Sequence, residues 1–378
     1  MITETGLSPP FSQNPRLDIS ALARVFNTYT NSYKFLFFQA LLAHLKEKDF
    51  PDSEVEIRLR DLAIEMAVLA WYPSSYFRLT FGSQDQICKL LRDVAHNKEN
   101  SISNGKLNKQ LREEIGGRYE KLELDRILLR YVQYAFLKPF FEEETLRAEG
   151  ARYERIVKDL SSHENRLSIP LYRFRGGDSS TIYVPREWMQ YLSTHYSIVE
   201  GWAKYEWAKF LQRRNPNVPA IIEKLEPPKT RGPLGMQTKF WDQIIQRKTI
   251  MCIYSQQPLI AGEFELDHFI PWSFVAHDEL WNLVPVKKDA NRSKGNKLPA
   301  DQYLMPMIQL HFLALTESKI FMGERNWHSI VESHLLALKL DYTSLLYKHR
   351  LTPAYKAILT PLMAIAKQIG FSDNWKFK

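Results

Sequence analysis

Apolar residues at helical spacing dominate the N-terminal part of the chain. The first predicted helix follows Asn31 or Ser32, either of which can cap it, and its apolar face contains Tyr33, Leu36, Phe37, Ala40 and Leu41. The same 3.6-residue period predicts further helices over residues 54–71, 84–97, 145–160 and 186–214. Their aromatic residues are expected to pack in a core, because an aromatic stripe on a helix more often belongs to a core than to a binding surface.

Two segments break this helical pattern. Residues 167–174 and 181–184 are rich in β-branched and aromatic residues and flank Gly176-Gly177-Asp178, which predicts a small β-hairpin near 167–184. Residues 215–235 accumulate prolines together with Lys229 and Arg231, which predicts a basic linker.

The pattern changes again after the linker. A helix is expected from Met236 to Arg247, followed by short polar strands up to Pro299 and by helices near 303–315, 327–340 and 352–368. The chain is therefore predicted to be mainly α with small β elements. Its expected parts are a helical domain (1–214), the linker (215–235), a compact module (236–300) and a helical C-terminal extension (301–378).

Composition narrows the function classes only a little. The 378 residues include 51 Lys and Arg against 43 Asp and Glu, and a net charge of +8 spread along the chain permits a nucleic-acid partner without requiring one. Only Cys88 and Cys252 are present, which excludes a disulfide framework and a four-cysteine zinc site. Because no apolar run reaches about 18 residues, a soluble, cytoplasmic protein without membrane contact is expected.

The polar residues that could carry chemistry lie between Cys252 and Pro299. The short strand from Phe264 ends in Asp267-His268, and Asn282 follows fourteen residues after the histidine, in an apolar strand predicted over 281–286. Asn291 comes nine residues later, in a predicted short helix over 287–297. A strand, loop, strand and helix in this order can bring these four side chains together.

These residue types suit hydrolysis of a phosphodiester. Asp267 and Asn291 offer hard oxygen ligands for Mg²⁺ or Mn²⁺, which bind few protein oxygens when phosphate and water supply the rest. His268 is the natural general base, provided that an acceptor holds its other ring nitrogen, and a carbonyl of Asn282 is expected to be that acceptor. His277, in the loop before the second strand, is expected to have a structural role.

A local block of positive charge accompanies this cluster. Residues 284–299 carry five basic residues against Asp289, so half of the net charge of the chain falls in this segment. The predicted phosphate contacts are Lys287, Lys288, Arg292, Lys294 and Lys297. A basic block beside such a cluster favours binding and cleavage of a polyanion.

The pattern Asp267-His268, Asn282 and Asn291, followed by Arg292-Ser293-Lys294, resembles the HNH, or ββα-metal, nucleases. The spacing is similar to that of the HNH domain in RNA-guided CRISPR nucleases. The resemblance implies that Asp267 and Asn291 bind one divalent metal, that His268 activates water, and that Asn282 orients the histidine or shapes the loop. It also implies in-line hydrolysis that leaves a 5′-phosphate and a 3′-hydroxyl.

The sequence departs from many HNH proteins in one respect. Where those proteins bind a structural zinc with two Cys-x-x-Cys pairs, this chain has Cys252 with Ser255, and Lys287 with Ala290. No structural zinc is therefore expected. Trp241, Trp272, Phe274 and Trp281 are expected to supply the stability that zinc supplies elsewhere.

The favoured hypothesis is a divalent-metal-dependent DNA endonuclease or nickase. Three N-terminal stretches are similar to standalone bacterial HNH proteins of restriction or anti-phage defence, and this resemblance implies such a role: FNTYTNSYKFLFFQALL (26–42), WYPSSYF (71–77) and FLQRRNPNVP (210–219). The alternatives are a DNA-binding scaffold with an HNH fold and no turnover, and an RNA-cleaving HNH nuclease. The helical N-terminal region is a candidate surface for DNA or for a defence-system partner protein, and cleavage of both strands would call for a homodimer or two encounters.

Overall fold

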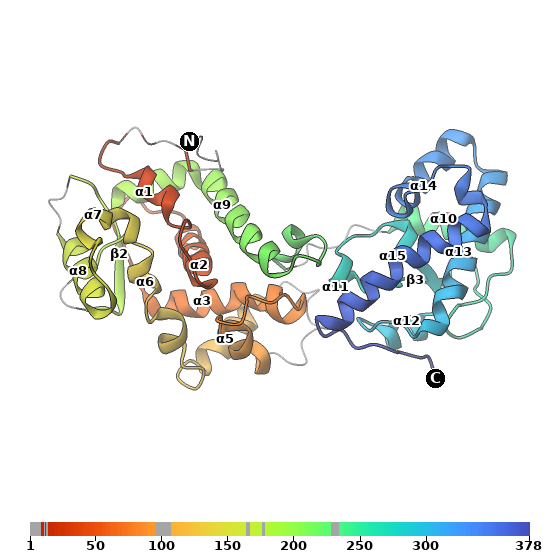
Figure 1. Ribbon diagram of the computed structural model, residues 1–378, viewed down its shortest axis with the longest axis horizontal. Coiled ribbons are helices and arrows are strands. Elements are labelled where there is room, and N and C mark those ends of the chain that lie inside the picture. Colours follow the sequence, from red (N-terminus) through yellow and green to blue (C-terminus); the bar gives the residue numbers. More distant parts are fainter. Residues whose placement is uncertain are drawn as a thin grey trace. The chain divides into compact units, whose positions relative to one another are not determined.

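The computed structural model describes residues 9, 10, 12, 14–94, 107–163, 167–175, 178–227 and 234–378. The chain divides into two compact units. The first unit comprises Met1–Pro216 and Ile221–Pro228, and the second comprises Asn217–Ala220 and Lys229–Lys378. Helices dominate the described residues, which contain two small antiparallel sheets of two strands each (Figure 1). The predicted fold class, mainly α with small β elements, is confirmed.

The first unit is built around three helices. Its helices are α1 (Ile19–Arg24), α2 (Tyr33–Glu47), α3 (Leu59–Trp71), α4 (Ile87–Leu90), α5 (Leu107–Gly117), α6 (Val132–Ala135), α7 (Glu142–Thr145), α8 (Gly150–Ser162) and α9 (Arg186–Arg214). Helix α2 packs against both α3 and α9. The ring of Phe35 stacks on Phe26 and lies 5.7 Å from Trp207, measured between ring centroids. Buried aromatic side chains of this kind are a major source of core stability. The helical pattern predicted that these aromatic residues would lie in a core, and Tyr205 on α9, which is exposed, is an exception.

The small sheet of this unit corrects two sequence predictions. The helix expected over 54–71 begins only at Leu59, because β1 (Val55–Arg58) alternates buried and exposed side chains as a half-buried strand does. Strand β1 pairs with β2 (Thr181–Val184) in antiparallel register, Val55 opposite Val184. The partner of strand β2 is therefore β1, more than a hundred residues earlier in the sequence, and not the arm of the hairpin predicted near 167–184. Only a bridge from Arg173 to Tyr183 joins the two expected hairpin arms, and residues 176–177 lie outside the described residues.

Other predicted boundaries also shift. The segment expected as a helix over 84–97 forms α4 and a 3₁₀ turn (Leu91–Asp93), and residues 95–97 lie outside the described residues. The helix expected over 145–160 is α8. Within the predicted linker, Ile221–Lys224 forms a 3₁₀ turn, whereas residues 228–233 lie outside the described residues. The long helix Arg186–Arg214 has the predicted bounds.

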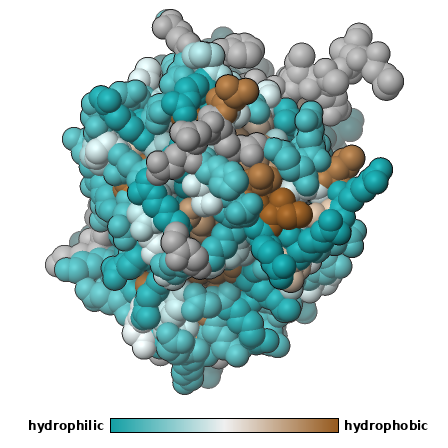
Figure 2. Space-filling model, turned by 90° about the vertical axis from the view of Figure 1, so that its left-hand side faces the viewer, coloured by the Kyte–Doolittle hydropathy of each residue, from teal (hydrophilic) through white to brown (hydrophobic). Residues whose placement is uncertain are grey.

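The surface of the first unit is mainly polar on the face shown in Figure 2. Hydrophobic atoms appear there as small separate patches among hydrophilic ones. Helix α8 contributes few buried residues, Val157 among them, as expected for a helix that lies on a surface. Across the described ranges of both units, no helix combines the length and the apolarity needed to cross a bilayer.

The second unit contains the second sheet and six helices among its described residues. The elements are α10 (Gly235–Arg247), β3 (Glu265–His268), α11 (Trp272–Val275), β4 (Leu283–Val286), α12 (Lys288–Lys294), α13 (Leu304–Phe321), α14 (Glu324–Leu338) and α15 (Lys348–Gln368). Strands β3 and β4 pair antiparallel with His268 opposite Leu283. The second strand begins later than predicted because Leu280–Asn282 form a 3₁₀ turn.

The C-terminal helices share one core with this sheet and its loops. Trp241 of α10 is fully buried and packs edge-on against His311 of α13. The hydroxyl of Tyr355 on α15 donates to the backbone oxygen of Trp281 at 3.3 Å. Near the C-terminus, the backbone N–H of Trp375 donates to the oxygen of Leu298. The segment after residue 300 thus contacts α10, the turn that precedes β4 and the loop that follows α12.

Candidate active site

The end of β3 buries an acid and an imidazole side by side. Asp267 is 4% exposed and His268 is 6% exposed. One carboxylate oxygen of Asp267 accepts a hydrogen bond from the hydroxyl of Tyr254 at 2.7 Å, and the other accepts one from the ammonium of Lys294 at 3.0 Å. A buried carboxylate needs such partners, because an unpaired charge in a protein interior is costly. The Asp267 carboxylate is therefore held in a fixed position beside His268.

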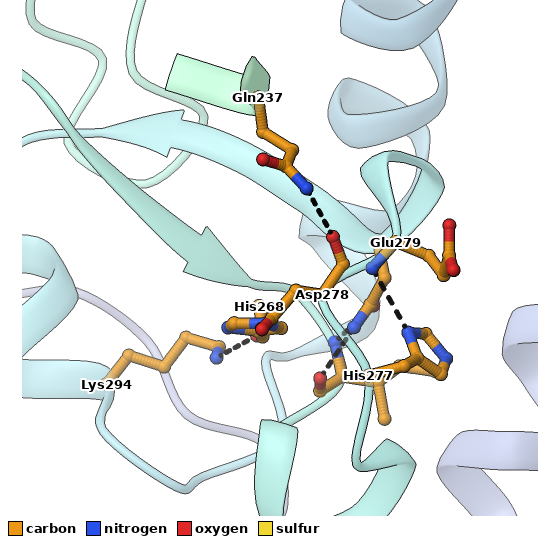
Figure 3. Close-up of polar contacts among 8 residues, drawn as sticks. Gln237, His268, His277, Asp278, Glu279 and Lys294 are labelled. Carbon is orange, nitrogen blue, oxygen red and sulfur yellow. Dashed lines mark hydrogen bonds and ion pairs between the residues drawn. The ribbon is translucent and has the colours of Figure 1, made fainter. Parts of the chain in front are cut away.

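A second carboxylate orients the histidine. His268 Nε2 lies 2.8 Å from an oxygen of Asp278, in the loop before β4 (Figure 3). Gln237 on α10 donates to the backbone oxygen of Asp278 at 3.1 Å and so fixes this loop. A carboxylate cannot donate, so Nε2 carries the proton of the neutral imidazole. The remaining nitrogen, Nδ1, is then unprotonated and forms no hydrogen bond with the described residues, as a general base requires.

Two roles were expected for Asn282, orienting the histidine or shaping the loop, and its hydrogen bonds fit the second. Its side chain is fully buried and forms two hydrogen bonds of 2.9 Å with Ile270, accepting from the backbone N–H and donating to the backbone oxygen. Its own backbone oxygen accepts from the N–H of Phe269. An amide side chain matches a peptide group in this way because it carries both a donor and an acceptor. Asn282 therefore shapes the loop that follows His268, and Asp278 is the acceptor.

Helix α12 lies against β3 and places Asn291 near the acid. The amide nitrogen of Asn291 donates to a carboxylate oxygen of Glu265 at 2.9 Å, two residues before Asp267 on the same face of the strand. One turn later, Lys294 reaches Asp267 itself. Asn291 and Lys294, three residues apart on α12, thus contact Glu265 and Asp267, two residues apart on β3. This pairing places Asp267 and Asn291 at the same contact between the helix and the strand.

A comparison with known protein families gave a match that includes strand β3 and helix α12. Residues 252–300 match the family model of the HNH endonucleases. These residues form an HNH-family domain. Neither the curated proteins nor the solved structures gave a match to the chain. The HNH domain indicates nuclease activity. The match covers a minority of the chain and supports no other family.

HNH nucleases generally use divalent metals, and the oxygen donors of this HNH domain fit one. Each oxygen of the Asp267 carboxylate has one hydrogen bond and a further lone pair. Asn291 uses its nitrogen toward Glu265, which leaves its amide oxygen as a ligand. The described residues contain no group of three or more His, Cys, Asp or Glu that could hold a metal. A site with two protein oxygens suits Mg²⁺, which keeps waters and binds phosphate oxygens.

The basic residues of the HNH domain divide into a buried one and a more exposed group. Lys294 is 0% exposed, and its ammonium pairs with Asp267 and donates to the backbone oxygen of His268 at 2.7 Å. Burial lowers the pKa of Lys294, whereas the charge of Asp267 opposes this shift. The structure thus corrects the expectation for Lys294, because a buried ammonium cannot meet a surface phosphate. The remaining predicted phosphate contacts are half-buried or exposed, namely Lys287, Lys288, Arg292 and Lys297.

Two of the four positions where many relatives carry zinc ligands, Cys252 and Lys287, lie together in this HNH domain. The backbone N–H of Lys287 lies 3.5 Å from the sulfur of Cys252. Ala290, on α12, is fully buried. Of the side chains at these four positions only Cys252 is a thiol, so the set cannot form the thiolate cage of a structural zinc. Of the aromatic residues expected to supply stability instead, Trp241, Phe274 and Trp281 are buried, whereas Trp272 is half-buried.

Sequence reasoning missed Asp278, which orients the base, and Tyr254, which orients the acid. The sequence did direct attention to this loop through His277, whose ring packs on Trp281 at 5.3 Å between centroids. The available signal was an acid in the loop between the histidine strand and the second strand. Any carboxylate there is close enough in the chain to reach the imidazole, since β3 and β4 are antiparallel neighbours.

Proposed function

We propose that this protein is a divalent-metal-dependent endonuclease that hydrolyses DNA phosphodiester bonds, one strand at each encounter. The observation that carries the proposal is the 2.8 Å contact between His268 Nε2 and Asp278, which leaves Nδ1 of the imidazole without a hydrogen bond to the described residues. The candidate oxygen ligands lie on the same strand and its neighbour: Asp267 precedes His268 in β3, and Asn291 of α12 binds Glu265 of β3. A pure binding module would need neither an oriented base nor these ligands.

The residues divide the work of hydrolysis between them. His268 Nδ1 takes a proton from the attacking water, and the carboxylate of Asp278 stabilises the imidazolium that forms. As water attacks phosphorus, the bond to the 3′ oxygen breaks and the leaving oxygen takes a proton from solvent, which gives a 5′-phosphate and a 3′-hydroxyl. Asp267 and Asn291 would hold Mg²⁺ or Mn²⁺, which supplies neutralisation of the charge that develops on the phosphate. Asn282 keeps the loop after His268 in shape through Ile270.

The exposed basic residues supply the expected contact with the nucleic acid. Lys288, Arg292 and Lys297 are exposed on and just after α12, the helix that carries Asn291, and Lys287 is half-buried at its start. Lysine and arginine contacts to phosphates dominate nucleic-acid affinity and position the strand without reading its sequence. These residues therefore support a nucleic acid as the substrate class and leave sequence recognition to other surfaces.

A plasmid-nicking assay tests the proposal. With Mg²⁺ or Mn²⁺ the wild type should convert supercoiled plasmid to the nicked form, and EDTA should stop the reaction. His268→Ala and Asn291→Ala should each abolish nicking while still binding DNA. Nicking by both variants at the wild-type rate would contradict the mechanism. Binding by all proteins without any nicking would favour the scaffold alternative, and preferential cutting of an RNA substrate under the same conditions would favour an RNA nuclease.

The proposal includes a role in bacterial restriction or anti-phage defence. Its support is the similarity of N-terminal segments to standalone bacterial HNH proteins, and the first unit is the proposed surface for DNA or for a partner protein. A host that expresses the wild type should plate phage less efficiently than one that expresses His268→Ala. Equal plating by the two hosts would oppose this role. Formation of linear plasmid whose rate rises with the square of protein concentration would indicate a homodimer.

A further inference from the structure

A large cavity lies in the first unit, and none of its described lining residues belongs to the HNH domain. Its volume is about 780 Å³, within the usual range of small-molecule sites. The segment between α1 and α2, residues around α6, and the start of α8 form its walls. All of these segments belong to the first unit. The cavity is therefore complete without any contribution from the HNH domain.

The cavity has an excess of positive charge. Its lining includes Lys34, Arg130, Lys138 and Arg213, with Glu149 as the one carboxylate among the described lining residues. Within the part of the chain that the structure describes, none of these four cations pairs with a carboxylate. Like charges that lack a counter-charge repel one another and attract an anion.

Two of these cations affect each other directly. The ammonium of Lys34 donates to the backbone oxygens of Val25 and Thr28 at 3.1 and 2.8 Å. Burial and, to a smaller extent, the charge of Lys138 together lower the pKa of Lys34 to about 8. Lys34 is still mostly charged at neutral pH, so two ammonium groups share this wall without a carboxylate between them. A bound phosphate would offset that repulsion.

Tyrosine rings form the other component of the lining. The hydroxyl of Tyr33 accepts from the backbone N–H of Gln86, and that of Tyr153 donates to the backbone oxygen of Tyr134. These hydroxyls are engaged with backbone, so each tyrosine contributes mainly its ring to the cavity. Tyr131 is 51% exposed, and the guanidinium of Arg130 lies over its ring, 4.9 Å from the centroid. Flat, partly exposed rings of this kind are platforms on which a base can stack.

We propose that this cavity binds a nucleotide, with the phosphate near Lys138 and Arg213 and the base against the tyrosine rings. The inference rests on the proposed function, because it names how the first unit recognises the nucleic acid that the HNH domain cuts. A nucleotide matches both components of the lining, since it joins a dianionic or monoanionic phosphate to a flat aromatic base. Its source is either an unstacked nucleotide of a single strand or a free nucleotide.

Binding is measured on the full chain in EDTA, so that cleavage plays no part. The probe is a fluorescein-labelled single-stranded DNA of about ten nucleotides, within the span of known single-strand sites, followed by anisotropy. Tyr131→Ala should weaken binding roughly tenfold, as loss of one stacking platform does. Lys138→Ala/Arg213→Ala should also weaken it and should lower the slope of log affinity against log salt by about 0.7 for each lost phosphate contact.

Matched control variants lie in the same unit outside the cavity. Lys109→Ala/Lys121→Ala removes two exposed positive charges, and Tyr205→Ala removes an exposed ring from α9. Both controls should bind the strand like the wild type. Thermal unfolding of every variant shows whether the first unit is still folded. A change of salt slope in the cavity variant but not in the charge control cannot come from a general loss of structure.

Calorimetry with dAMP separates the two sources of the nucleotide. Binding of dAMP that the cavity variants lose indicates a free nucleotide, whereas variant-sensitive binding of the strand alone indicates a nucleotide within a chain. Wild-type affinity of the cavity variants for both probes, or no binding of either probe by the wild type, overturns the inference. The plasmid assay reports independently on the HNH domain. If the wild type nicks plasmid DNA but the cavity variants bind both probes as the wild type does, the nucleotide site is refuted and the proposed nuclease function is not.

Discussion

Two buried histidine sites lie in the second unit, and they differ in the partner of the imidazole. His268 faces the carboxylate of Asp278 at 2.8 Å. His311 on α13 and His334 on α14 face each other, with 3.2 Å between Nδ1 of the first and Nε2 of the second. All three side chains are almost completely buried. Burial alone therefore does not distinguish a candidate catalytic base from a core residue.

The partner decides what each imidazole can do. A carboxylate stabilises the imidazolium that forms when the ring accepts a proton, whereas a neutral imidazole offers no negative charge to offset the cost of burying that cation. Burial lowers the pKa of His334 to about 3, and burial together with the neighbouring His334 lowers that of His311 well below its usual value. The pair stays neutral and packs against the rings of Trp241 and Tyr355. It belongs to the core that braces the HNH domain.

Cleavage should show the largest difference between the two histidine sites. His268→Ala removes the proposed general base, and a positioned base typically contributes about 10²–10⁴-fold to a rate. The nicking rate of His268→Ala at saturating protein should fall by that amount. His334→Leu should leave the rate unchanged, since among the described residues the hydrogen bond and ring contacts of His334 are with His311 and Tyr355 rather than with His268 or Asp278. If both folded variants lost nicking activity equally, His268 would not differ from His334 in its contribution to cleavage.

The role of the carboxylate partner can be divided into charge and orientation. Asp278→Asn keeps an oxygen that accepts from His268 Nε2 but removes the charge, and Asp278→Ala removes both. Loss of such a supporting partner typically costs about 10–100-fold in activity. Asp278→Ala should therefore lower kcat by this factor, Asp278→Asn should lower it less, and KM should change little in either. A rise in KM without a change in kcat would assign Asp278 to substrate binding instead.

The sequence predicted the elements around the site well because they are local. Strand β3 and helix α12 carry Asp267, His268 and Asn291 within short segments whose own pattern specifies them. Strand β1 was missed for the opposite reason. Its partner β2 lies far along the chain, and the helical period of α3 begins directly after Arg58, so the local pattern favoured a longer helix.

Side-chain partners were harder to predict than elements. Lys294 lies in a basic block that looks like a solvated surface, and only the packing of α12 on β3 turns it inward toward Asp267. Asp278 lies in an irregular loop without a periodic signal, so its distance from His268 depends on the path of that loop. In both cases the missing information is tertiary, because the contact depends on which face of one segment meets another.

The pH dependence of stability should show the smallest but most specific difference. In the unfolded chain both core histidines titrate near pH 6.5, and in the fold their pKa values lie lower. Below about pH 6.5 the unfolded state thus binds protons that the folded state does not, so the free energy of unfolding falls as the pH falls, and it continues to fall toward pH 3. Each histidine contributes up to about 1.4 kcal/mol per pH unit.

Urea unfolding followed by tryptophan fluorescence, repeated at pH 7, 6 and 5, measures this dependence. The transition of the second unit should lose stability toward pH 5 in the wild type, because Trp241 reports on the core that contains the pair. His334→Leu removes one of the two titrating groups, so its loss of stability between pH 6 and 5 should be smaller by about 1 kcal/mol. His163→Leu, at an exposed histidine of the first unit, is the control and should leave the wild-type dependence unchanged. Identical pH dependence in His334→Leu and the wild type would show that the pair does not remain neutral in the fold.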